Sequence, residues 1–250
     1  MLNNIQKFNT VKFISKAKNE KFLYNRNIEV KAVAKKNVSK KAITEAALEI
    51  LHEKGIAALT MRNIAAKLKV QAPALYWYIK NKQELLQLIG EYISSQIIFP
   101  KKKNNWQEEM TELALEIRKV LLSVPNGAEI MMDTLPITKN RLQLINKTFE
   151  IFYRAQFPEH KIFTAVLAIN NYVTTYVLDE QRQLQMVKLI GEEEIHKQFS
   201  AAIRQMPADE IPYVYRHMLK QEGIINTETN FLAGLTIILK GIEGGIKEEK

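Results

Sequence analysis

The sequence contains no cysteine, which excludes a disulfide framework and any site built on thiolate ligands or a thiolate nucleophile. It also lacks an apolar run of the roughly 18 residues that a membrane-spanning helix needs. The first residues, MLNNIQKF, contain no apolar signal core. We therefore predict a cytoplasmic protein with no membrane partner.

Histidine is scarce and scattered. The four histidines are His52, His160, His196 and His217, and no two of them form an HExxH pair. The sequence has no GxSxG motif and no glycine-rich phosphate loop. The acidic run Glu192–Glu194 is more typical of a solvated surface than of a metal site. Because no acid, base and nucleophile come together, we predict no catalytic residue, no metal site and no cofactor, and we do not expect an enzyme.

Negative charge is rare in the first third of the chain. Residues 1–82 hold 17 Lys and Arg against 5 Asp and Glu, a net charge of +12, whereas residues 83–250 hold 19 against 22, a net charge of −3. This asymmetry predicts a polyanionic partner for the N-terminal part, or else a solubilising tail. Residues 1–37 are a basic extension, which is either an arm on DNA or a disordered segment with no specific role.

Two capped helices are predicted between Ser39 and Leu68. Ser39 is an N-cap candidate, and apolar residues recur at helical spacing up to Gly55, which we expect to end the helix in a left-handed conformation. Thr60 is an N-cap candidate for the second helix, whose apolar stripe ends at Leu68. A left-handed Lys69 in the following turn would cost about 1–2 kcal/mol, so we expect a strained or shifted turn.

A third, shorter helix is predicted after this turn. Pro73 suits a first helical turn, and residues 74–78 then read ALYWY. A helix this short is unstable alone, so neighbours must hold it while its other side faces a partner. This arrangement predicts a helix-turn-helix, whose second helix enters a DNA major groove. A small helical core with no role in DNA binding is the alternative.

The run ALYWYIKNKQELL, with LTMRNIAAKL before it, resembles the DNA-binding domain of the tetracycline-repressor (TetR) family. A run of the form LYW…KNK after capped helices is a far more specific signal than a bare helix-turn-helix pattern. The resemblance extends more weakly through the rest of the chain. It implies an all-α fold, with a three-helix DNA-binding domain followed by a helical domain for ligand binding and dimerisation.

The resemblance also implies roles for single residues. Arg62 matches an arginine that reads a base, and Ala72 replaces a glutamine of tetracycline-responsive members, so we do not expect the tetracycline operator. Leu75 should belong to the core. Hydroxyl and lysine side chains should contact phosphates. Such contacts fix the position of the protein on the duplex but do not distinguish one base sequence from another. The expected DNA-binding residues are Thr60, Arg62, Gln71, Pro73, Ala74, Tyr76, Trp77, Tyr78, Lys80 and Lys82.

Beyond these residues the chain keeps a helical period. A helix from Asn81 to a point before Pro100 should link the two domains, and the polar stretch 101–105 follows. Further helices are predicted at 106–122, 128–133, 138–157, 159–183, 184–206, 209–222 and from 226 or 227 to about 246. The expected divisions are the extension at 1–37, the DNA-binding domain at 38–82, the connecting helix and linker at 83–103, and the effector-binding and dimerisation domain at 104–250.

The last predicted helix contains Gly234, Gly241 and Gly245, and each internal glycine costs up to about 1 kcal/mol. Close approach of another backbone would compensate for this cost. Together with residues 159–183, the helix could form a four-helix bundle across a two-fold axis, or the two faces could pack within one chain. Family members pair through helices near the C-terminus, so the resemblance implies a homodimer.

Residues 127–136 resemble the effector-pocket loop of tetracycline-binding members. Met131 replaces the histidine that would hold magnesium, and Leu135 replaces an arginine. Asp179 still provides a carboxylate near a second position that would face the metal. Few oxygen ligands for a hard cation remain, so we expect an apolar or aromatic effector rather than magnesium–tetracycline. A closed core without a ligand is the alternative. The expected ligand-binding residues are Leu113, Ile117, Met131, Thr134, Leu135, Phe149 and Phe163.

These observations predict a DNA-binding transcriptional regulator, namely a ligand-released repressor that binds a palindromic operator as a homodimer. Two alternatives stay open. The first is a regulator controlled by a protein partner with no small-molecule ligand, and the second is a non-specific architectural DNA binder. An open apolar cavity in the C-terminal half would favour a ligand, whereas a packed core with an exposed patch would favour a protein partner.

Overall fold

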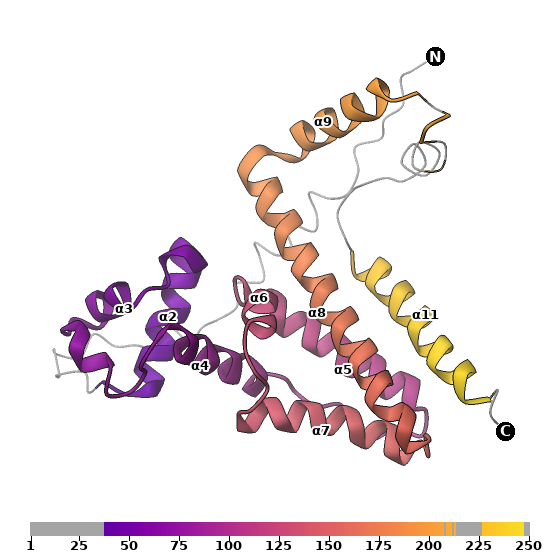
Figure 1. Ribbon diagram of the computed structural model, residues 1–250, viewed down its shortest axis with the longest axis horizontal. Helices are drawn as coiled ribbons and strands as arrows, with labels where there is room; N and C mark the ends of the chain where they lie inside the picture. The colour runs from indigo at the N-terminus through magenta and orange to yellow at the C-terminus, as the bar shows by residue number, and fades with distance from the viewer. Residues whose placement is uncertain (1–37, 208, 212, 214–226, 248–250) are drawn as a thin grey trace. The chain divides into compact units, whose positions relative to one another are not determined.

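The computed structural model describes residues 38–207, 209–211, 213 and 227–247. Helices joined by turns make up these residues, and no strand occurs among them, so the all-α prediction is confirmed (Figure 1). The predicted helix at 209–222 falls almost entirely outside the described residues. The elements are α2 (Lys40–Lys54), η1 (Ile56–Ala58), α3 (Met61–Leu68), η2 (Ala72–Leu75), α4 (Lys82–Ser95), α5 (Trp106–Ser123), α6 (Gly127–Met132), α7 (Lys139–Arg154), α8 (Glu159–Ile190), α9 (Glu192–Gln205) and α11 (Glu228–Lys247).

Residues 38–82, here called the head, begin with two helices that are capped as predicted. The Ser39 hydroxyl accepts a hydrogen bond from the Ala42 amide at 3.1 Å, and the Thr60 hydroxyl accepts one from the Asn63 amide at 3.2 Å. α2 packs against α3, and the apolar residues expected on the inner face of α2 are buried, as is Thr44. On α3 the buried residues are Ile64, Ala65 and Leu68. Gly55 has the expected positive φ of 73°, but its ψ of −178° is extended rather than left-handed helical. Essentially only glycine adopts that combination.

α4 joins the head to the C-terminal helices. The Asn81 side chain caps it by accepting a hydrogen bond from the Glu84 amide at 2.8 Å. α4 packs against α2 of the head and also against α6 and α7. Its residues Leu85, Ile89 and Ile93 are fully buried. α4 is therefore part of the hydrophobic core on both sides.

α5, α6, α7 and α8 pack together into the core of the C-terminal half (Figure 1). The rings of Trp106, Phe152 and Phe157 meet with centroids 4.8–5.4 Å apart. α7 ends at Arg154 rather than at the predicted Phe157, because Gln156 adopts a left-handed φ of 56° and the Phe157 amide bonds back to the Phe152 carbonyl. This pattern is that of a Schellman motif, which ends a helix by satisfying its last carbonyls.

The boundary between α8 and α9 differs from the prediction. α8 continues past the expected end at Gln183 to Ile190, and Gly191, with φ 83° and ψ 148°, makes the break. No helix-breaking residue stands between Gln183 and Gly191, so the helix has no physical reason to stop earlier. Within the described chain, α9 contributes no buried side chain.

α11 packs against α8 and α5. This helix was predicted to start at residue 226 or 227, and Thr227 caps it, since its hydroxyl accepts a hydrogen bond from the Asn230 amide at 3.3 Å. The close neighbour of Gly234 is the ring of Tyr172 on α8 and not a second backbone, which corrects the prediction at this position. A Cβ at Gly234 would overlap the Tyr172 hydroxyl, which donates to the Phe231 carbonyl at 2.8 Å. At Gly241 and Gly245 a Cβ would meet no described heavy atom within 4 Å.

Candidate functional site

The head exposes aromatic side chains next to basic ones. Trp77 is 89% exposed, and Tyr76 and Tyr78 are also exposed. Lys80 and Lys82 follow at once and are exposed as well. Nine of the ten predicted DNA-binding residues are exposed, and the tenth, Ala74, is half-buried. Three consecutive large aromatics left in water are unusual for a surface without a partner.

The segment that presents these aromatics is shorter than predicted. An α-helix over residues 74–78 was expected, but the structure has the 3₁₀ helix η2 followed by a turn through Tyr78. Pro73 has no N–H, and the segment closes with short-range bonds, including Ala74 amide to Gln71 carbonyl at 2.9 Å. Leu75 is fully buried, as predicted, and anchors the segment from below.

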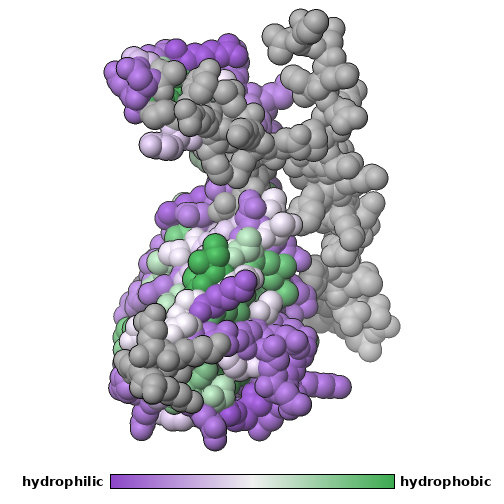
Figure 2. Space-filling view, turned by 90° about the vertical axis from the view of Figure 1, so that its right-hand side faces the viewer, coloured by the Kyte–Doolittle hydropathy of each residue, from purple (hydrophilic) through white to green (hydrophobic). Residues whose placement is uncertain are grey.

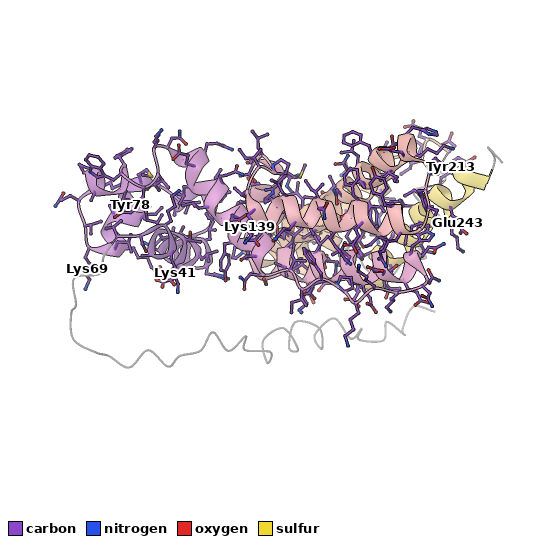
Figure 3. All side chains as sticks on the ribbon, turned by 90° about the horizontal axis from the view of Figure 1, so that it is seen from below. Lys41, Lys69, Tyr78, Lys139, Tyr213 and Glu243 are labelled. Atoms are coloured by element: carbon purple, nitrogen blue, oxygen red, sulfur yellow. The ribbon has the colours of Figure 1, made fainter. Side chains whose placement is uncertain are left out.

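Lys69, in the turn between α3 and η2, is left-handed, with φ 58° and ψ 41°. Its amide bonds to the Ala66 carbonyl at 3.1 Å, and the Val70 amide bonds to the Ala65 carbonyl at 3.0 Å. The turn is thus strained, as expected of a non-glycine residue there. Figure 3 shows Lys69 and Tyr78 within the head.

Lys69→Gly is expected to raise the free energy of unfolding by about 0.5–1 kcal/mol. Removing the left-handed penalty contributes about 1–2 kcal/mol, and the greater unfolded-state freedom of glycine offsets part of it. Urea unfolding followed by circular dichroism measures the change. Lys69→Ala removes the same charge but keeps the backbone penalty, so it should give no such gain. Equal stabilisation by both variants would mean that charge, not backbone strain, is responsible.

A polar stripe on α4 holds the segment between α6 and α7. Gln83, Gln87 and Glu91 stand at i, i+4 and i+8, on one face of the helix. The Gln83 amide donates to the Asp133 carbonyl at 2.6 Å, and the Gln87 amide donates to the Leu135 carbonyl. The Glu91 carboxylate accepts from the backbone and side-chain amides of Asn140, the latter at 2.7 Å. Movement of residues 133–140 is therefore coupled to α4.

Arg141 of α7 closes the same region from the other side. Its guanidinium donates to the Thr134 hydroxyl at 2.5 Å and to the Met131 carbonyl at 3.1 Å. Burial lowers the pKa of Arg141, and the nearby Glu91 acts against that shift. A cation beside the last carbonyls of α6 also suits the negative end of that helix. Gly90 of α4 leaves room for the contact, since a Cβ there would lie 3.1 Å from both Arg141 and Thr134.

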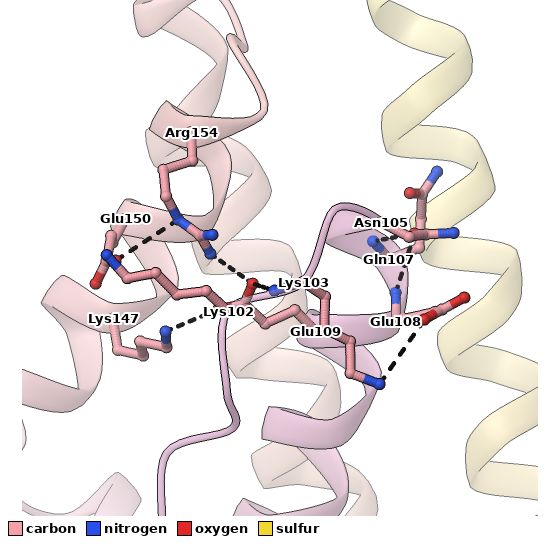
Figure 4. Close-up of polar contacts among 9 residues, drawn as sticks. All are labelled: Lys102, Lys103, Asn105, Gln107, Glu108, Glu109, Lys147, Glu150 and Arg154. Carbon is pink, nitrogen blue, oxygen red and sulfur yellow. Dashed lines mark hydrogen bonds and ion pairs between the residues drawn. The ribbon is translucent and has the colours of Figure 1, made fainter.

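A buried ionic cluster joins α5 to α7 and to the preceding linker (Figure 4). The Glu109 side chain is 0% exposed, and its carboxylate lies 2.7 Å from the Lys147 ammonium and 2.5 Å from the Arg154 guanidinium. It also accepts from the Lys103 amide at 2.9 Å. Burial alone would raise the pKa of Glu109, but the bonds from Arg154 and Lys147 outweigh burial and lower the pKa to about 2. Sequence analysis missed this cluster, although Glu109 stands four residues before Leu113 on the buried face of α5.

The structure spreads out the seven residues predicted to bind a ligand. Leu113, Ile117 and Thr134 are buried, Met131 and Phe149 are half-buried, and Leu135 and Phe163 are exposed. Phe149 lines a shallow groove on the outer face of α7, with Leu142, Ile145 and Tyr153. Asp179 lies at the edge of a cleft between α8 and α9. The assignment of these residues to an effector site remains a prediction.

Among residues 38–207, 209–211, 213 and 227–247, no three His, Asp or Glu side chains gather in a way that could hold a metal ion. None of the helices described combines the length and the apolar character needed to cross a membrane.

Comparison with known proteins matches both halves of the chain. Residues 43–89 match the family described as "Bacterial regulatory proteins, tetR family", and residues 99–246 match "Tetracyclin repressor-like, C-terminal domain". The class D tetracycline repressor protein of Escherichia coli is 26% identical over 212 residues, which are 82% of this chain and 89% of that protein.

Two solved structures place the fold among the same proteins. The Streptomyces coelicolor TetR family protein ActR in complex with actinorhodin superimposes with a TM-score of 0.74 at 22% identity, over 86% of this chain and 100% of that chain. A tetracycline repressor variant from Acinetobacter baumannii AYE in complex with minocycline gives a TM-score of 0.63 at 27% identity, over 84% of this chain and 95% of that chain.

Proposed function

Since the chain belongs to the TetR family of bacterial regulatory proteins, we propose that it is a cytoplasmic repressor that binds a palindromic operator as a homodimer and releases it when a small molecule binds. Residues 38–82 bind DNA, and residues 104–250 dimerise and bind the effector. α4 transmits the change caused by effector binding to the DNA-binding residues. The observation that carries the proposal is the exposed segment Tyr76–Tyr78, supported from below by Leu75 and followed by two exposed lysines.

The proposed DNA contacts fall into two groups. Arg62, at the start of α3 and exposed, reads a guanine edge with its two-pronged donor, and Gln71 and Ala74 lie beside the same groove. The Thr60, Tyr76, Lys80 and Lys82 side chains contact phosphates, which fix the register of the head on the duplex. Trp77 lies against the DNA backbone, which explains why so large a ring is left exposed.

The proposed dimer forms through α8 and α11. Exposed apolar side chains lie on both helices, among them Leu167 on α8 and Ile237 on α11. Figure 2 views the side of the molecule that carries α11 and shows apolar residues gathered among hydrophilic ones. Gly241 and Gly245 leave space for a close neighbour. A two-fold pair would place its heads on half-sites about 34–36 Å apart.

The contacts of α4 support control by a ligand. Gln83, Gln87 and Glu91 bind the segment that follows α6, so any ligand that shifts this segment also shifts α4 and the head. The effector is proposed to be apolar or aromatic, because Met131 and Leu135 stand where tetracycline-binding members carry metal-side and polar groups.

A second candidate is control by a protein partner. Leu113 and Ile117 are packed in the core, and α7 carries a second apolar stripe, Leu142, Phe149 and Tyr153, on its outer face. A packed core with an exposed apolar stripe is the pattern expected of a protein-binding surface.

The test of DNA reading uses Arg62→Ala on an operator selected from random duplexes. Losing a two-pronged base contact should weaken operator binding about 10- to 100-fold, with little effect on random DNA. Fluorescence anisotropy with labelled duplexes measures both affinities. Lys82→Ala is the matched control, since loss of a phosphate contact should weaken both duplexes by the same factor. Equal losses on both duplexes for Arg62→Ala would contradict the reading role.

A further inference from the structure

α7 carries apolar side chains on two opposite faces. Its inner face is buried in the core, through Leu144, Ile151 and Phe152. A second apolar set, here called the outer stripe, recurs at i, i+3, i+7 and i+11 on the opposite face. The outer stripe consists of Leu142, Ile145, Phe149 and Tyr153. Since a surface helix normally carries polar residues opposite its buried face, the outer stripe is not explained by the packing of the described residues.

The outer stripe lies along a shallow groove of about 720 Å³. Leu142 is 53% exposed at one end, and Tyr153 is 51% exposed at the other, where its ring stacks on that of Phe149 with centroids 6.5 Å apart. At 1.5 Å per residue the stripe is about 16 Å long. All the side chains that line the groove come from α7. An open groove of this length along one helix fits a second helix better than a compact molecule.

Basic side chains surround the groove. Lys139 is exposed at the start of α7, and Lys102 is exposed in the linker before α5. Towards the other end of α7, the Lys102 ammonium lies 2.9 Å from the Glu150 carboxylate, and the Arg154 guanidinium lies 3.6 Å from it (Figure 4). These four residues, here called the rim, carry three positive charges against one negative charge, a net charge of +2.

The sign of the rim selects the partner. Glu109, which also pairs with Arg154, is shared with Lys147, so the rim keeps its positive sign. Two copies of this face would bring like charges together, which opposes pairing of the face with itself. A helix with carboxylates beside an apolar stripe would bury the outer stripe and neutralise the rim. We propose that the outer face of α7 docks an acidic amphipathic helix of a partner protein.

This inference rests on the proposed function, because it names the surface and the class of partner for control of the same regulator by a protein. Asn140, in the first turn of α7, donates through its backbone amide to the Glu91 carboxylate of α4 at 3.0 Å. α4 in turn packs against α2 of the head. A helix that docks on α7 and shifts it therefore also shifts α4 and the head.

The probes are three labelled synthetic peptides of about 18 residues, each with leucine at heptad positions a and d. Their flanking positions carry glutamate, glutamine or lysine. Ile145→Glu should weaken binding of the glutamate peptide to the full chain at least tenfold, as measured by fluorescence anisotropy. Leu189→Glu is the matched control, because Leu189 is 77% exposed on α8 and outside the groove, and it should change binding less than threefold. Equal effects of the two variants would overturn the docking surface.

A second pair of variants tests the charge preference. Lys102→Gln combined with Lys139→Gln keeps the outer stripe intact. It should weaken binding of the glutamate peptide about fivefold at low salt and leave binding of the glutamine peptide within twofold. Lys188→Gln combined with Lys197→Gln removes two exposed lysines elsewhere and should change neither affinity. Binding of the lysine peptide as tight as that of the glutamate peptide would overturn the partner class.

Operator binding, measured on the same variants, separates this inference from the function it rests on. The glutamate peptide should weaken operator binding at least threefold for the wild type and for Leu189→Glu, but not for Ile145→Glu. Weakening that persists in Ile145→Glu would mean that the peptide competes with DNA for the basic head, and it would overturn the docking surface. Peptide binding by a wild type that shows no operator preference overturns the proposed function instead and leaves the surface in place.

Two other occupants of the groove would also overturn the proposal. The first is a second copy of the chain. It is indicated by a wild type that binds none of the peptides and whose assembly, measured by sedimentation, becomes smaller in Ile145→Glu. The second is a small molecule. It is indicated by binding of the neutral dye N-phenyl-1-naphthylamine that Ile145→Glu removes, with no binding of the glutamate peptide.

Discussion

Glu109→Ala is expected to lower the free energy of unfolding by about 3–5 kcal/mol, because it leaves a buried charge without its partner. Glu109 is fully buried, and the Lys147 side chain beside it is also buried. Arg154 is partly exposed and can turn to solvent, but Lys147 cannot do so without opening the packing between α5 and α7. Denaturant unfolding of the full chain measures the loss.

Two comparisons make this result specific. Glu112→Ala breaks a surface pair on the same helix, since Glu112 is exposed and lies 2.6 Å from Lys103, and it should cost less than about 1 kcal/mol. Replacing both Glu109 and Lys147 by methionine removes the unpaired charge and should restore most of the lost stability. Similar losses for Glu109→Ala and Glu112→Ala would show that the buried pair contributes nothing special.

The same cluster implies a pH dependence. The pKa of Glu109 is lowered from 4.5 to about 2, so the folded state holds the carboxylate more readily charged than the unfolded state does. Its stabilisation is complete above the ordinary pKa and is lost as the pH falls from about 4.5 towards 2. A difference of this size corresponds to roughly 3 kcal/mol. The double methionine variant should lose less stability than the wild type over that pH range.

Operator affinity is expected to fall about 100-fold when the salt concentration rises from 50 to 200 mM. Lys80 and Lys82 in each of two heads give about four phosphate contacts, and each released counterion contributes about 0.9 to the slope of log affinity against log salt. Lys82→Ala removes two contacts per dimer and should make that slope shallower by about 1.8. Anisotropy titrations at several salt concentrations give both slopes.

Lys188→Ala provides the control for the salt experiment. Lys188 is exposed on α8, away from the residues assigned to DNA, so its loss should leave the slope unchanged. An unchanged slope for Lys82→Ala would remove Lys82 from the phosphate contacts. Equal changes for both variants would mean that total charge, not the surface of the head, sets the salt dependence.

The features that sequence analysis predicted well are those decided within one or two helical turns. The predicted caps at Ser39 and Thr60, and the predicted helix starts at Asn81 and Thr227, depend on a side-chain oxygen within three residues of the amide that donates to it. The local sequence therefore contains the necessary information. The burial of Leu75, which the resemblance implied, is confirmed as well. The all-α fold follows from many such short-range sequence preferences.

The features that were missed depend on residues far apart in the chain. Glu109 and Lys147 are separated by 38 positions, and neither sequence neighbourhood shows that the two charges meet in the core. Helical spacing alone would have placed Glu109 on the face of Leu113, which was the available signal. The length of η2 was also misjudged, because Pro73 permits both an α-helical start and a 3₁₀ turn. The predicted ligand residues came from the resemblance to the family. A resemblance matches positions in the sequence, but it does not say how the side chains at those positions are packed in this chain.

The contact between Glu91 and Asn140 also limits how this protein can be recombined. The first turn of α7 receives its hydrogen-bond acceptor from α4, on a residue 49 positions earlier in the chain. A chimera that imports a foreign DNA-reading module through α4, without a carboxylate at this position, would leave free amides at the start of α7. In a chimera of two such regulators, the junction between the parent chains should therefore lie before Gln83. Gln83, Gln87 and Glu91 then stay with the C-terminal half that they bind.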